Sequence, residues 1–225
     1  MTVDLTAIHT SIADLGRHMS SCTGCSTASG PKKGTPPRCL WFEGSEQVST
    51  GVIVVGLNPG RADEPEREFY RKHGMGFDAT VEYLQLNAGS IRYYLKMRNF
   101  VAAAFGQPGG VPSIHWTELA KCELLPGLTR VPLDMKRTCV NRHLKKELDL
   151  LPRDWPIVAT GREAFESMAI LAGDRAVIGV PHPTGAFGSM FSQLIDGAKL
   201  ARGAARLTKE ALRDQSAVWL PNQPG

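Results

Sequence analysis

The order of apolar and polar positions divides the chain into alternating strand-like and helix-like segments. Residues 52–55 are a continuous run of β-branched side chains, which is typical of a strand buried on both faces. Three further short apolar runs predict strands at 114–119, 156–160 and 176–180. Apolar residues at spacings of three and four predict helices at 1–20, 78–105, 130–151, 162–172 and 191–212. Strands separated by helices predict an α/β fold, a three-layer α/β/α sandwich around a central, mostly parallel four-stranded sheet.

The composition agrees with one globular domain over residues 1–225. The chain has 225 residues of which 42% are hydrophobic, enough for a sizeable core, and we expect residues 215–225 to form a tail. It contains no run of 18 apolar residues and no basic region followed by an apolar signal segment at its start. We therefore expect a soluble, cytoplasmic protein without membrane contact. The net charge of +4 permits an anionic partner without requiring one.

The first candidate for chemistry is the loop that follows the buried strand at 52–55. It reads GLNPG, and Asn58 is its one polar side chain, stiffened by the following Pro59. Because ligands collect at the carboxyl ends of parallel strands, Asn58 is a candidate site residue, although Asn-Pro-Gly is also ordinary turn chemistry. The polar stretch 61–74 follows directly. Its Asp63, Phe69 and Tyr70 are candidates to line a pocket, and a solvated loop is the simpler interpretation for most of its charges.

Cysteine spacing is the strongest metal signal. The five cysteines include a Cys22-x2-Cys25 pair, and Cys122 and Cys139 each fall near the end of a predicted element. Four thiolates suit either zinc or an iron–sulfur cluster, because both accept four sulfur ligands. The alternative is that Cys122 and Cys139 are small core residues. Cys39, in a Gly/Pro/Lys-rich loop, is an alternative ligand.

Two further features are candidates for binding. His182 stands between two prolines after the strand at 176–180, and the parallel sheet brings it to the same edge as Asn58, although a lone histidine is more often structural. A basic cluster could meet phosphates or be a solvated helix face. Its members are Arg130, Lys136, Arg137, Arg142, Lys145 and Lys146.

Taken in order, these motifs resemble the uracil-DNA glycosylase superfamily. The matching features are Cys-x2-Cys, GLNPG after a buried strand, a strand ending in Lys-Cys with a second Cys sixteen residues on, VATGREA and HPTG, over roughly residues 22–195. The chain is most similar to the iron–sulfur-containing bacterial and archaeal branch, with a first motif like that of the mismatch-specific branch. The resemblance implies a DNA-repair enzyme of base excision, a monomer that binds uracil-containing DNA and hydrolyses the bond between uracil and deoxyribose.

The resemblance also implies roles for particular residues. Asn58 orients the attacking water, His182 stabilises the negative charge on uracil O2, and Asp63 or the next residue could assist the water. The flipped base rests against Gly56 and Leu57 and stacks on Phe69 or Tyr70. The implied ligands of a [4Fe-4S] cluster are Cys22, Cys25, Cys122 and Cys139.

The chain departs from the family pattern at two positions. Glu118 stands where the iron–sulfur branch has an Asn that reads N3–H and O4 of uracil, and an ionised carboxylate only accepts hydrogen bonds. Ala186 stands at the wedge position that is often Leu, so Phe187 is the expected wedge. The position of Glu118 leaves open a uracil- or damaged-DNA-binding protein with little turnover. A zinc-bound α/β module unrelated to DNA is a third possibility.

Overall fold

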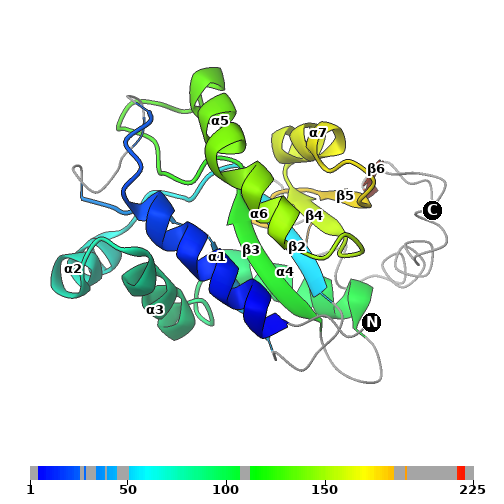
Figure 1. Cartoon of the computed structure of the whole chain (residues 1–225), viewed down its shortest axis with the longest axis horizontal. Helices are drawn as coiled ribbons and strands as arrows, with labels where there is room; N and C mark the ends of the chain where they lie inside the picture. Colours follow the sequence, from blue (N-terminus) through cyan, green and yellow to red (C-terminus); the bar gives the residue numbers. More distant parts are fainter. Residues whose placement is uncertain are drawn as a thin grey trace.

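The computed structural model describes residues 5–25, 28, 34–38, 40–44, 51–106, 112–184, 191 and 217–220. Its helices are α1 (Leu5–Ser20), α2 (Glu64–His73), α3 (Phe77–Asn87), α4 (Arg92–Phe105), α5 (Leu133–Cys139), the π-helical turn η2 (Val140–Leu144), α6 (Lys145–Leu150) and α7 (Arg162–Leu171). Its strands are β1 (Leu40–Glu43), β2 (Gly51–Gly56), β3 (Ser113–Glu118), β4 (Ile157–Thr160), β5 (Val177–Val180) and β6 (Ala217–Trp219). Figure 1 shows how these elements are arranged.

The described strands form one mixed sheet in the order β1-β3-β2-β4-β5-β6. The four predicted strands are β2 to β5, and they pair in parallel as expected. The predicted number of four strands is wrong, because β1 joins one edge antiparallel to β3 and β6 joins the other edge parallel to β5. The expectation of a tail at 215–225 is also wrong in part, because Ala217–Trp219 of this segment form the strand β6. Gly179 leaves room for this strand, since a Cβ there would lie 2.3 Å from the Trp219 ring.

Helices pack against both faces of the sheet, and β2 shows why. Val52 and Val54 point into a core with residues of α3 and α4, whereas Ile53 and Val55 point into a second core with residues of α1, α6 and α7. All six residues of β2 are buried, as its continuous apolar run predicts. Figure 1 shows α1 and α6 in front of the strands and α4 behind them. The fold is therefore α/β with β2 at its centre.

The polar stretch after β2 is a helix, contrary to the expected solvated loop. Asp63 caps α2 by accepting a hydrogen bond from the Glu66 backbone N–H at 2.9 Å, and proline lies in the first turn. Tyr70 is the only buried residue of α2, so the helix has almost no apolar face for a periodicity search to find. Its ends are set by charge, with acidic residues in the first turn and basic residues in the last.

The predicted helix at 130–151 is interrupted in its middle. It consists of α5, the π-helical turn η2 and α6, and η2 begins directly after Cys139. The expected inward positions Cys139, Leu144, Leu148 and Leu151 are all buried. No helix among the described residues is long and apolar enough to cross a membrane.

The strand order identifies the edge of the sheet at which a ligand fits. The chain leaves β2 toward β3 on one side and returns from β3 to β4 on the other side of β2. Such a reversal opens a crevice at the carboxyl end of the central strand. That end of β2 carries the GLNPG loop.

Candidate functional site

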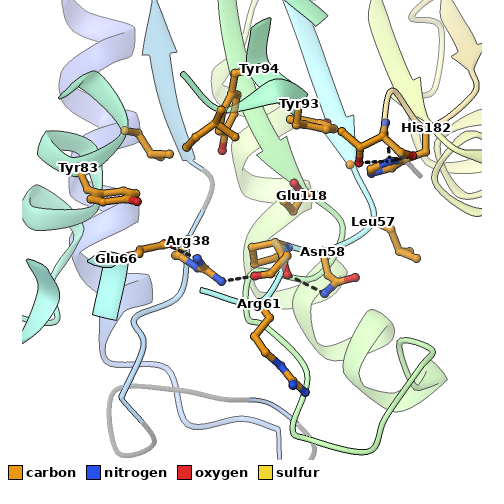
Figure 2. A pocket seen from close by; sticks show the side chains of 16 residues that line it. Arg38, Leu57, Asn58, Arg61, Glu66, Tyr83, Tyr93, Tyr94, Glu118 and His182 are labelled. Carbon is orange, nitrogen blue, oxygen red and sulfur yellow. Dashed lines mark hydrogen bonds and ion pairs between the residues drawn. The ribbon is translucent and has the colours of Figure 1, made fainter. Parts of the chain in front are cut away.

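A pocket of about 450 Å³ lies at the carboxyl ends of β2 and β3, a size usual for small-molecule sites. Figure 2 shows the side chains that line it. Its walls come from the GLNPG loop, from α2 to α4, from the end of β3 and from the segment after β5. The lining residues are Arg38, Gly56, Leu57, Asn58, Pro59, Gly60, Arg61, Glu66, Tyr83, Leu84, Ile91, Tyr93, Tyr94, Glu118, His182 and Thr184.

Several residues predicted from the sequence meet in this pocket. Gly56, Leu57, Asn58, Glu118 and His182 all line it, although they come from three separate segments of the chain. The parallel sheet brings their segments to one edge, as the sequence reasoning expected. In the view of Figure 2, the side chain of Leu57 lies between those of Asn58 and His182.

Glu118 lies against the backbone of the GLNPG loop. It is paired with Gly56 across β2 and β3, and its side chain is only 6% exposed. A Cβ on Gly56 would lie 2.0 Å from Glu118 Oε2 and 2.6 Å from its Cδ. Glycine at position 56 therefore makes the space in which the carboxyl group of Glu118 sits, and this carboxyl group forms part of the pocket wall.

The GLNPG loop is fixed at its start by the neighbouring strand. The backbone N–H groups of Leu119 and Ala120 donate to the carbonyls of Gly56 and Leu57 at 2.9 and 3.0 Å. The Asn58 side chain donates from Nδ2 to the Pro59 carbonyl at 2.9 Å. This bond leaves the Oδ1 end of the amide as the group that Asn58 can offer to a water molecule.

His182 is held by its own turn. Its Nδ1 lies 3.0 Å from the Thr184 carbonyl oxygen, 3.1 Å from the Thr184 hydroxyl and 3.3 Å from the Thr184 backbone nitrogen. When the hydroxyl and the N–H donate to Nδ1, the ring proton lies on Nε2. The imidazole is exposed, and its centroid lies 5.5 Å from that of the Tyr93 ring.

The aromatic wall of the pocket is formed by Tyr83, Tyr93 and Tyr94, which the sequence reasoning did not single out. The predicted stacking residues Phe69 and Tyr70 do not line the pocket. Tyr70 is fully buried and donates to Glu66 at 2.9 Å, while Phe69 stacks on His73. Burial and the nearby charge of Glu66 raise the pKa of the Tyr83 hydroxyl, so this residue stays a neutral hydrogen-bonding group.

Two other predicted residues lie elsewhere. The carboxylate of Asp63 is the N-cap of α2 and is not part of the pocket lining, so helix capping accounts for its position. Phe187 and the neighbouring Ala186 lie outside the described residues, as does Cys39.

The four predicted ligand cysteines come together at the other side of the GLNPG loop. Cys25, Cys122 and Cys139 share an apolar cluster with Leu57, and Cys22 lies 3.3 Å from Nε2 of His143 in η2. All four are free thiols. Burial, followed by the charge of neighbouring cysteines, raises the pKa of Cys25 to about 11 and that of Cys122 to about 12.

The donor set of these cysteines has the chemistry of the implied cofactor. Four cysteine side chains and no carboxylate form the set, which is the ligand chemistry of zinc and of [4Fe-4S] clusters. Cysteines bind a metal as thiolates, so binding would release the thiol protons to solvent, and the metal charge would then offset the repulsion among the thiolates. Within the described ranges, no three His, Cys, Asp or Glu side chains are arranged to hold a single metal ion. The four cysteines therefore have the right chemistry for a cofactor held by thiolates, but among the described residues their side chains do not surround the position of a single ion.

The basic cluster lies largely in solvent. Arg130, Arg137, Arg142, Lys145 and Lys146 are exposed, whereas Lys136 pairs with Glu163 of α7. Arg142 covers the turn between the first two cysteines, since a Cβ on Gly24 would lie 2.8 Å from its guanidinium. Apart from Arg130, the cluster lies on α5, η2 and α6, and none of its members lines the pocket.

A scan against models of known protein families finds no match for this chain, and a search of curated proteins finds no relative. The resemblance to uracil-DNA glycosylases therefore stays a prediction.

Proposed function

We propose that this protein removes uracil from DNA by hydrolysing the bond between the base and its deoxyribose, using a three-layer α/β/α scaffold. The observation that carries the proposal is that Asn58, His182 and Glu118, from three distant segments, line one aromatic-walled pocket. A planar base needs flat apolar walls and a few polar groups on its edges, which is what this lining offers.

The target base must leave the DNA stack before it can enter this pocket. Flipping costs a few kcal/mol, and contacts with phosphates help to offset it. Arg61 is suited to such a contact, because it is exposed at the pocket and Figure 2 shows it pointing away from the tyrosines. Tyr93 is our candidate for the ring that packs against the flipped base.

Bond cleavage develops positive charge on the sugar and negative charge on uracil. An Nε2–H of His182 directed at uracil O2 stabilises the leaving base, an effect worth roughly 3–4 kcal/mol for one well-placed donor. The Thr184 hydroxyl and N–H favour this tautomer when they donate to Nδ1, whereas the Thr184 carbonyl oxygen at 3.0 Å favours a proton on Nδ1. Asn58 has no useful pKa, so it orients water through Oδ1 instead of acting as a strong base.

Within this proposal, Cys22, Cys25, Cys122 and Cys139 hold a [4Fe-4S] cluster. Two observations support this ligand set. All four side chains are free thiols, and three of them pack in one apolar cluster with Leu57 of the GLNPG loop and Met135 of α5. The cluster would serve to hold these segments together, and it takes no part in the hydrolysis proposed here.

The experiment is a single-turnover measurement of uracil release from single- and double-stranded oligonucleotides. Wild-type protein is compared with Asn58→Ala and His182→Ala, and with Asn99→Ala as a matched control, because Asn99 is exposed on α4 away from the pocket. We expect release by the wild type and the control and a loss of about 100-fold or more in the two pocket variants. No release above background with any substrate refutes the enzyme proposal.

Glu118 favours a second candidate, a protein that binds uracil or damaged bases with little turnover. An ionised carboxylate accepts from N3–H of uracil but meets the carbonyl oxygens on either side, which weakens the fit of this base. Tight binding of uracil-containing DNA without release of the base, in the same experiment, would support this candidate instead.

A further inference from the structure

We propose that Arg38 and Glu123 are positioning residues that hold the GLNPG loop in place and connect it to the thiol cluster. The catalytic part of this inference rests on the proposed function, whereas the structural part does not. Both side chains are buried, with 6% exposure for Arg38 and 3% for Glu123. Neither residue stands out in the sequence, because neither belongs to a motif or a periodic pattern.

Arg38 joins three separate segments through one guanidinium. It forms an ion pair with Glu66 of α2, donates to the Gly60 carbonyl and donates to Glu123 Oε2 at 2.9 Å. Figure 2 shows its guanidinium between Glu66 and the GLNPG loop. The guanidinium suits this arrangement, because its planar fork presents several N–H groups in fixed directions.

Glu123 completes the arrangement from the side of the cysteines. Its Oε2 also accepts from the Ala62 backbone N–H at 2.8 Å, and its Oε1 accepts from Arg67 at 2.6 Å. The residue follows Cys122 directly, and the Arg38 backbone N–H donates to the Lys121 carbonyl at 2.7 Å. Two cations and two carboxylates thus neutralise one another inside the protein.

These bonds hold the end of the loop at two points. Gly56 and Leu57 are fixed by the strand next to them, but the carbonyl of Gly60 and the N–H of Ala62 bond to Arg38 and Glu123. Asn58 lies between the two fixed ends. Loss of the second anchor would leave Asn58 free to move relative to His182, and small displacements of a positioning group lower rates strongly.

The test uses hydrogen exchange of the backbone, read by NMR, together with single-turnover release and DNA affinity. Glu123→Gln removes the charge and leaves one acceptor oxygen for three donors, and Arg38→Lys keeps the charge while removing the fork. Glu163→Gln is the matched control, because Glu163 forms its ion pair with Lys136 of α5, outside the network. We expect at least tenfold faster exchange of the Ala62 N–H and at least tenfold slower release in the two variants, with DNA affinity unchanged, and wild-type behaviour in the control.

The outcomes separate this inference from the proposed function. The inference is overturned if a folded Arg38→Lys or Glu123→Gln protein exchanges the Ala62 N–H at the same rate as the wild type. If Glu123→Gln does not fold, the test still rests on Arg38→Lys. Faster exchange with wild-type release overturns the catalytic part alone. If the wild type releases no uracil, the proposed function fails and the exchange result still decides whether these residues hold the loop.

Discussion

Replacing Gly56 by alanine tests the geometry of the pocket wall directly. The new methyl group would lie 2.0 Å from Glu118 Oε2 and 2.7 Å from Oε1, so the carboxyl group must move. It is the end of a flexible side chain that borders the pocket, and it can move into that space. We therefore expect a cost of about 1 kcal/mol, the low end for overpacking, and a fall in Tm of about 2–4 °C.

A double-mutant cycle with Glu118→Ala assigns this cost to its cause. Removing the carboxyl group removes the obstacle, so the double variant should lose about 1 kcal/mol less than the sum of the single variants. Gly51→Ala is the control on the same strand, because its Cβ would lie 2.2 Å from the Trp155 ring. The buried indole cannot move aside as the carboxyl group can, so we expect a loss of about 3 kcal/mol that Glu118→Ala does not relieve.

The assay is urea unfolding of the variants at one pH, followed by fluorescence and circular dichroism. Coincident transitions permit the free energies of unfolding to be compared. Additive effects of Gly56→Ala and Glu118→Ala would refute the packing of this carboxyl group on Gly56, as would equal relief of Gly51→Ala.

Three further predictions concern the metal, the base and pH. Wild-type protein should bind iron and absorb at about 400 nm, Cys122→Ser should lose both, and Cys39→Ser should keep both; a colourless zinc protein would contradict the cluster. Glu118→Asn, which adds a donor for O4, should raise uracil release about tenfold, and an unchanged rate would exclude this residue as a reader of the base. Burial lowers the folded-state pKa of His115 below its ordinary 6.5, so the unfolded chain binds more protons and stability falls as pH drops below about 6.5. His115→Leu should flatten that fall in urea unfolding between pH 7 and 5.5, and an unchanged slope would assign it to other groups.

The central part of the fold follows from local patterns in the sequence. The apolar run at 52–55 predicts a doubly buried strand, and β2 has this environment. Parallel pairing brings the residues after β2 and β5 to one edge, which is why Asn58 and His182 were found as candidates, whereas Glu118 was singled out through the family resemblance. A shared metal site for the four cysteines was inferred from their types and spacing, and it stays a prediction.

The parts that were missed lack such local patterns. The helix α2 has one buried residue, and the signals that mark it are the Asp63 cap and the charges at its ends. The strands β1 and β6 have four and three residues, too short for alternation to stand out, and they depend on pairing with distant partners.

The tyrosines of the pocket were missed for a related reason. Tyr93 and Tyr94 are neighbours on α4, and only the tertiary structure shows that both border the same pocket. The network of Arg38 and Glu123 joins residues 85 positions apart, so no window along the chain contains both. Long-range polar contacts of this kind leave no periodic trace in a sequence.

The proposed removal of uracil from DNA is tested most directly by identifying the products of the reaction. A uracil-containing duplex is incubated with excess wild-type protein and analysed by mass spectrometry for free uracil and for a strand with one abasic site. We expect both products in equal amounts, with neither formed by His182→Ala at the same time point. An intact strand that stays bound to the wild-type protein would contradict the proposal.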